Sequence, residues 1–97
     1  MADNFRIDRH VSGNGLRLKL SGDFDGSSAM ELLGAIADNS GAAHPIYIET
    51  DGLREIHSFG RQVFKKKLPG SPAWGKELVF TGAYSQEFPP RLLPDNR

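Results

Sequence analysis

Alternating apolar and polar residues predict two neighbouring strands near the N-terminus. Phe5, Ile7 and Val11 share one parity, which is the pattern of a half-buried strand. Residues 16–20 then alternate without error, and the Ser-Gly-Asn-Gly run at residues 12–15 supplies the residues that a tight turn needs. The two segments are therefore predicted to form an antiparallel hairpin.

The apolar spacing becomes helical after residue 26. Apolar residues at this spacing are Leu32, Leu33, Ile36 and Ala37. Ser28, with Glu31 three residues later, predicts a capping box at the start of the helix. The Asn-Ser-Gly run at residues 39–41 predicts its end. A helix is therefore expected near residues 28–39.

The second half of the chain continues the alternation of strand and helix. A short apolar run at residues 45–48 predicts a central strand, closed by the Thr-Asp-Gly turn signal at residues 50–52. A helix is predicted over residues 58–68 and should end at the Pro-Gly pair of residues 69–70. Its expected buried side chains are Phe59, Val63, Phe64 and Leu68. The apolar triplet at residues 78–80 predicts a strand covered on both faces.

This order of elements predicts an α/β fold. Strands that alternate with helices pair in parallel, so we expect a small mixed sheet of about four strands, with the N-terminal antiparallel hairpin at one edge and two or more helices. A chain of 97 residues suits one core. We assign residues 1–83 to that domain and residues 84–97, which are rich in proline, to an irregular C-terminal tail.

Composition narrows the classes of partner and of site. Twelve Lys and Arg balance twelve Asp and Glu, so no overall field draws the protein to nucleic acid or to an anionic membrane. Cysteine is absent, which excludes disulfides, thiolate metal sites and cysteine nucleophiles. The N-terminus lacks the apolar run of a signal peptide, and no run spans a bilayer. We expect a cytoplasmic protein without a membrane span.

Nothing in the chain combines the groups of a catalytic or metal site. The adjacent His57 and Ser58 lack a Gly-x-Ser-x-Gly elbow, and neighbours in sequence seldom bring a base onto a nucleophile. The histidines His10, His44 and His57 lack metal-ligand spacing. The sequence therefore predicts no enzyme, no metal and no cofactor.

Several short blocks follow one another in a suggestive order. Residues 18–25 combine a strand, a glycine and an acidic segment, and residues 46–49 form the central strand. The Ile-His-Ser-Phe-Gly run at residues 56–60 opens the second helix, and residues 78–82 give a strand and a glycine. Together these blocks resemble the STAS domain family, named for sulphate transporters and anti-sigma factor antagonists.

The resemblance implies a STAS-like regulatory domain with a protein partner, either an anti-sigma factor, a serine kinase or a related regulator. In the antagonists of that family, a loop serine is phosphorylated by the partner kinase, and the equivalent residue here is Ser58. The chain departs from the family pattern at His57, where an acidic residue is usual, and at Phe59, where a small residue is usual.

Two interpretations of Ser58 stay open, because a serine at a helix start is also a preferred N-cap. Asp23 and Asp25 should share the carboxyl edge of the sheet with Ser58 and could repel a phosphate there. Alternatively, Asp25 or Ser27 caps the first helix. The predicted switch or partner surface comprises Asp23, Asp25, His57, Phe59, Gly60 and Arg61.

Two functional hypotheses follow. The first is a protein-binding regulator of the anti-sigma factor antagonist type, switched by phosphorylation of Ser58. The second is a STAS-like sensing module that binds a small anion, nucleotide or lipid near the acidic segment and His57. The basic residues Arg61, Lys65, Lys66 and Lys67 suit a solvated face, contact with an acidic partner, or contact with lipid headgroups. The sequence leaves self-association open.

Overall fold

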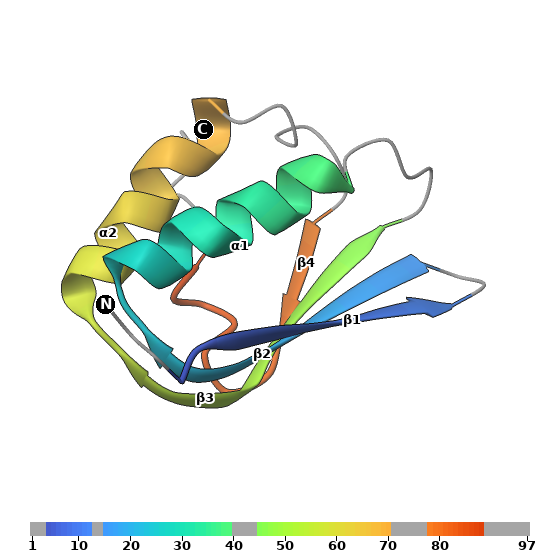
Figure 1. The fold of residues 1–97 in the computed structure, drawn as a ribbon, viewed down its shortest axis with the longest axis horizontal. Helices are drawn as coiled ribbons and strands as arrows, with labels where there is room; N and C mark the ends of the chain where they lie inside the picture. Colours follow the sequence, from blue (N-terminus) through green and yellow to red (C-terminus); the bar gives the residue numbers. More distant parts are fainter. Residues whose placement is uncertain (1–3, 13–14, 40–44, 71–77, 89–97) are drawn as a thin grey trace, which may run out of the picture.

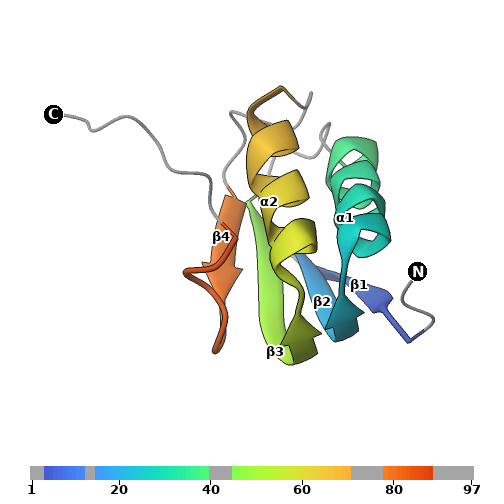
Figure 2. The ribbon, with the colours of Figure 1, turned by 90° about the vertical axis from the view of Figure 1, so that its left-hand side faces the viewer.

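Four strands form one mixed sheet, and two helices lie against one of its faces (Figure 1, Figure 2). The computed structural model describes residues 4–12, 15–39, 45–70 and 78–88. The strands are β1 (Arg6–Ser12), β2 (Gly15–Phe24), β3 (Ile46–Ile56) and β4 (Leu78–Thr81). The helices are α1 (Gly26–Asp38) and α2 (Ser58–Lys67), and a 3-10 turn follows at Leu68–Gly70. The predicted α/β class and element order are confirmed.

The strands lie in the order β1-β2-β3-β4. β1 and β2 form the predicted antiparallel hairpin, with Ser12 opposite Gly15. β2 and β3 are parallel, and so are β3 and β4. Both helices connect parallel strands and cover the same face of the sheet (Figure 2). The carboxyl ends of β2 and β3 therefore lead directly to the starts of α1 and α2.

The core lies between this covered face and the helices. Every second residue is buried there over residues 16–20 of β2 and 46–50 of β3, as period-two strands require. These residues are Leu16, Leu18, Leu20, Ile46, Ile48 and Thr50. The helices add buried side chains at helical spacing: Ala29, Leu32, Leu33 and Ile36 from α1, and Phe64 from α2. Leu68, just beyond α2, is also buried.

The opposite face of the sheet carries polar side chains. Arg17 forms an ion pair with Glu49, and its guanidinium lies 5.3 Å from the centre of the Tyr47 ring. Among the residues that the structure describes, no helix covers this face (Figure 2). The prediction that β4 is covered on both faces is wrong for that reason, and Val79 is 39% exposed.

Two predicted strand ends were also wrong. β3 does not stop at the Thr-Asp-Gly signal of residues 50–52 but continues to Ile56 beside an equally extended β2. The pairing of β2 and β3 continues past the Thr-Asp-Gly run, with register shifts between Lys19 and Ser21 and between Gly22 and Asp23. Asp23 consequently lies in a strand, not in a loop.

Exposure differs from the predictions at two apolar residues. Phe59, predicted to be buried, is 67% exposed, because the buried side of α2 runs through Gly60 and Phe64 to Leu68. Val11, predicted to face the core, is 68% exposed. It lies towards the tip of the hairpin, which extends past the end of α1 (Figure 1).

The segment after β4 folds back into the core. The Thr50 hydroxyl donates to the Thr81 carbonyl at 2.7 Å and accepts from the Tyr84 amide at 3.1 Å. The Asp51 carboxylate accepts from the Ala83 amide at 2.8 Å. Residues 83–87 form turns, and Phe88 is completely buried.

Phe88 completes a cluster of aromatic rings. Its centroid lies 4.8 Å from that of Phe24 and 5.6 Å from that of Phe64, both edge-on, and its ring stacks on Phe80 at 6.1 Å. Residues 84–88, expected in an irregular tail, therefore pack with the domain. The rest of the predicted tail, residues 89–97, lies outside the described residues.

Replacing Phe88 by alanine should lower the free energy of unfolding by about 3–5 kcal/mol, because it leaves a cavity among three aromatic rings. Val79→Ala, on the open face, should cost about 1 kcal/mol or less. Chemical denaturation measures both variants. Similar small losses at the two positions would show that Phe88 is not part of the core.

Candidate functional site

β2 and β3 end side by side at one edge of the sheet. Phe24 is paired with Ile56, and the His57 amide donates to the Phe24 carbonyl at 2.9 Å. α1 begins two residues after Phe24, and α2 begins two residues after Ile56. The predicted placement of the acidic segment and Ser58 on one edge is therefore confirmed, while their functional roles stay predictions.

The two helix starts meet at Gly60. This glycine is buried, and a Cβ added to it would lie 2.6 Å from the carbonyl carbon and oxygen of Asp25. Real Cβ atoms do not approach backbone so closely, so only glycine fits here without a shift of one helix. Gly60, predicted to be part of a partner surface, supports that surface from beneath.

Asp25 is the N-cap of α1. Its Oδ1 accepts from the Ser28 amide at 2.9 Å, from the Ser27 hydroxyl at 2.8 Å and from the Ser28 hydroxyl at 3.0 Å. These hydrogen bonds, the Ser28 amide first, hold the pKa of the Asp25 carboxyl far below its usual range. The interpretation that Asp25 caps the helix is confirmed. The predicted Ser28–Glu31 capping box is wrong, because α1 starts at Gly26 and Ser28 is buried within it.

Asp23 forms a two-point ion pair with Arg54 of β3. The Arg54 Nε donates to Oδ1 at 3.0 Å and Nη2 to Oδ2 at 2.7 Å. Arg54 lowers the pKa of the Asp23 carboxyl, chiefly through these hydrogen bonds. The pair lies at the surface, so it adds little to stability. It does neutralise the charge that was expected to repel a phosphate at Ser58.

Ser58 is the first residue of α2 and not its cap. The N-cap is His57, whose side chain makes no capping bond and whose Nε2 lies 3.7 Å from Glu55 Oε1. Ser58 is exposed, and within the described residues its hydroxyl makes no hydrogen bond. The capping interpretation is therefore wrong. The Ser58 hydroxyl therefore has no structural role among the described residues.

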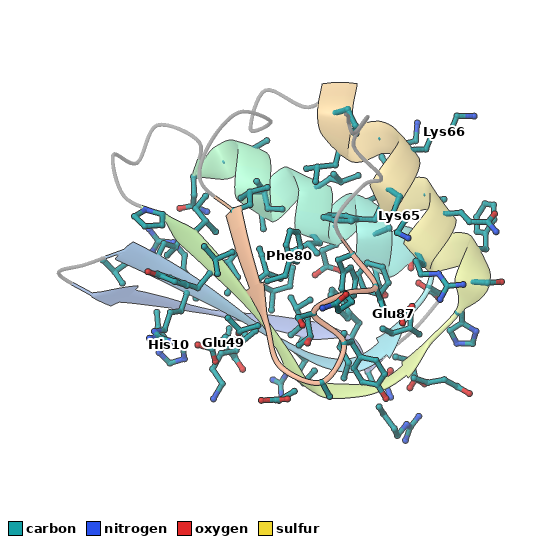
Figure 3. All side chains as sticks on the ribbon, turned by 180° about the vertical axis from the view of Figure 1, so that it is seen from behind. His10, Glu49, Lys65, Lys66, Phe80 and Glu87 are labelled. Atoms are coloured by element: carbon teal, nitrogen blue, oxygen red, sulfur yellow. The ribbon has the colours of Figure 1, made fainter. Side chains whose placement is uncertain are left out.

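Arg61, one helical turn after Ser58, connects α2 to the segment after β4, residues 82–88. Its Nη1 lies 2.5 Å from Glu87 Oε1, and both side chains are part-exposed. Figure 3 shows Glu87 beside the first turns of α2. Because Phe88 follows Glu87 directly, this ion pair joins the start of α2 to the residue that closes the aromatic core.

Phe59 stands at the head of an exposed face of α2. Its ring lies over the backbone of Gly26, where an added Cβ would be 2.9 Å away. A shallow hollow follows along the helix at spacings of three and four residues. We call its lining residues the α2 face: Phe59, Gln62, Val63, Lys66 and Lys67. An apolar centre with a cationic end is thus exposed beside Ser58.

Sequence reasoning missed the partners of several of these residues. Arg54 and Glu87 were not predicted as site residues, although they pair with Asp23 and Arg61. The pairs join residues 31 and 26 positions apart, so no local signal connects them. Within the described residues, no group of three or more His, Asp or Glu side chains is arranged to hold a metal ion, and no helix is long and apolar enough to cross a bilayer.

Comparison with known proteins gives matches in structure alone. No protein-family model and no curated protein matches the sequence. The structure of the anti-sigma factor antagonist SpoIIAA in its unphosphorylated form matches 95% of this chain and 89% of SpoIIAA, with a TM-score of 0.57 and 15% identity. The structure of Mglu matches 78% of this chain at a TM-score of 0.64 and 18% identity, but this chain covers only 19% of Mglu.

At these identities the matches show the fold alone. This chain shares its fold with SpoIIAA over nearly the whole length of both proteins. The STAS-like α/β fold that the sequence predicted is therefore confirmed.

The cap at Asp25 gives a prediction about pH. Asp25→Ala should lower the free energy of unfolding by about 1 kcal/mol at pH 7, whereas Asp25→Asn keeps a capping oxygen and should cost less. Because folding depresses the pKa of the Asp25 carboxyl, its charge stabilises the fold at pH values above its usual pKa of 3.8, and that contribution is lost as the pH falls towards the lower pKa of the folded state. Denaturation from pH 7 to pH 2 should show the parent and Asp25→Asn converging. A constant difference would contradict the assigned cap.

Proposed function

We propose that this domain is a regulatory protein-binding module that meets its partner through the start and the exposed face of α2, with Ser58 as a phosphorylation site. The partner class is an anti-sigma factor, a serine kinase or a related regulator, and the module works in the cytoplasm without catalysing a reaction. The observation that carries the proposal is an exposed Ser58 whose hydroxyl makes no hydrogen bond to any residue that the structure describes, beside an exposed Phe59.

The α2 face has the chemistry of a docking surface. Phe59 offers a large apolar side chain to solvent, and buried aromatic anchors supply much of the affinity of protein interfaces. Lys66 and Lys67 at the far end of the hollow favour a partner that carries Asp or Glu beside an apolar side chain. The acidic residues Asp23 and Asp25 are engaged by their own chain, so the proposal rests on α2.

The position of Ser58 suits a phosphate. The amides of a helix's first turn have no partners within the helix and favour an anion there. Arg61 stands three residues later, close enough on a helix for a side-chain pair. A phosphate of charge about −1.5 to −2 would compete with Glu87 for Arg61. Phosphorylation of Ser58 would thus change the charge of the surface and weaken the Arg61–Glu87 ion pair, which joins α2 to the segment after β4.

The structural match supports this class of function. SpoIIAA is described as an anti-sigma factor antagonist in an unphosphorylated form, and its fold is shared over 95% of this chain. A fold hosts more than one function, so the proposal is argued from the side chains at the start of α2.

Phe59→Ala should weaken partner binding about tenfold or more, because it removes the apolar anchor. A tagged domain purified from its native cells would recover the partner, and titration calorimetry with the purified partner would give the affinity. Met30→Ala, which removes another exposed apolar side chain on α1, is the matched control and should bind like the parent. Equal affinities for all three proteins would exclude the α2 face as the interface.

Mass spectrometry of the domain from native cells should find a phosphate on Ser58. Ser58→Asp should weaken partner binding, and Ser58→Ala should bind like the unmodified parent, because only the first adds charge to the surface. If the phosphate is absent under every growth condition and Ser58→Asp binds normally, Ser58 is not the switch.

A further inference from the structure

Within the described residues, β1 leaves a regular strand edge uncovered. It is the outermost strand of the sheet, and its seven residues pair with β2 in unbroken register from Arg6 opposite Ser21 to Ser12 opposite Gly15. Neither a proline nor a bulge interrupts it. In the described part of the chain, no strand lies on its outer side. Such an edge presents unpaired backbone groups to which another strand can bond.

The side chains of β1 complement a second, antiparallel β1. Full overlap of two copies places Ile7 opposite Val11 and Asp8 opposite His10, each pair occurring twice. Ile7 and Val11 project on the helix-covered side, since they oppose the core residues Leu20 and Leu16. Val11, 68% exposed in one chain, would gain an apolar neighbour. On the open face, the Asp8 carboxylate can accept from an imidazole N–H of His10.

Arg9 would lie on the twofold axis and face its own copy. That like-charge contact is unfavourable, but the acidic side of α1 offsets it. The Arg9 Nε donates to Asn39 Oδ1 at 3.1 Å, and Glu31 and Asp38 line the same hollow as Arg9. The guanidinium therefore leans toward α1 and not toward the strand edge.

The hollow between β1 and α1 continues this edge. It is open to solvent and has an apolar floor formed by Ile7, Leu18, Met30, Gly34 and Ala35. Met30 is 52% exposed. A strand added at β1 would place its Val11 at the rim of this floor, next to Ile7, and would cover apolar surface as well as backbone groups.

We propose that two copies of this chain associate through antiparallel pairing of their β1 strands, with Arg9 on the twofold axis. The two four-stranded sheets then become one continuous sheet. Figure 2 shows α1 over the side of the sheet that ends in β1, and α2 further away, towards β3 and β4. The dimer thus leaves both α2 faces open, and the inference stands independently of the proposed function.

Cysteine cross-linking tests the pairing and its register, because the chain has no cysteine of its own. Arg9→Cys should form a disulfide-linked dimer under mild oxidation, since directly opposed residues bring their Cβ atoms close enough for a disulfide. Ile7→Cys and Val11→Cys should form no disulfide-linked dimer when each is oxidised alone and should cross-link when mixed. Val79→Cys, on the opposite edge strand, is the control.

Cross-linking of Arg9→Cys no faster than that of Val79→Cys would overturn the proposal. Rapid cross-linking of Ile7→Cys alone would also overturn it, because that result requires another register.

Light scattering over a concentration series tests association without a covalent bond. The parent should approach the mass of two chains. His10→Asp faces Asp8 of the second copy with a like charge and should raise the dissociation constant about tenfold. The double variant Asp8→His/His10→Asp should restore the parent's value. A parent that stays monomeric at every concentration, or a double variant as weak as His10→Asp, would contradict the pairing.

Discussion

The close approach of α2 to α1 at Gly60 is the constraint on which the site depends. Because Gly60 has no side chain, the first turn of α2 packs directly on the backbone of Asp25. Next to this contact, the Phe59 ring packs on Gly26. With α2 held there, Phe64 faces inward and its ring packs edge-on against Phe24 at 6.3 Å. Ser58 and Phe59, on the other side of the same turn, consequently face solvent.

The same arrangement connects the surface to the core. Phe88 packs against both Phe24 and Phe64, so the segment after β4 closes the core that α2 helps to form. Its neighbour Glu87 holds Arg61 on α2. A change of charge at Ser58 would therefore act close to the Arg61–Glu87 ion pair. Glu87 is followed directly by the buried Phe88.

The sequence predicted the elements and their order, because periodicity is local. It failed where burial depends on distant parts of the fold. Phe59 was expected in the core because it is apolar, yet the buried side of α2 passes through Gly60. Glycine has no apolar side chain, so a search for apolar positions does not mark this side of the helix as buried. Val11 and Val79 are exposed because α1 ends short of the hairpin tip and because no described helix covers the far face.

The candidate site was predictable to the same extent. Parallel strands implied that Asp25 and Ser58 share an edge, and they do. The hydrogen-bond partners of the site depend on tertiary contacts, and so Arg54 and Glu87 were missed. Phe88, placed by sequence in a proline-rich tail, became a core residue through turn contacts at Thr50 and Asp51.

The substitution Gly60→Ala, compared with Gly34→Ala, tests most directly whether this one contact positions the whole site. Gly60→Ala should lower the free energy of unfolding by about 1–3 kcal/mol and shift the backbone amide signals of residues 25–28 as well as 57–61. Gly34→Ala, where a Cβ meets open space in mid-helix, should stabilise the protein by up to about 1 kcal/mol. A Gly60→Ala protein as stable as the parent, with shifts confined to the immediate neighbours of residue 60, would contradict the account.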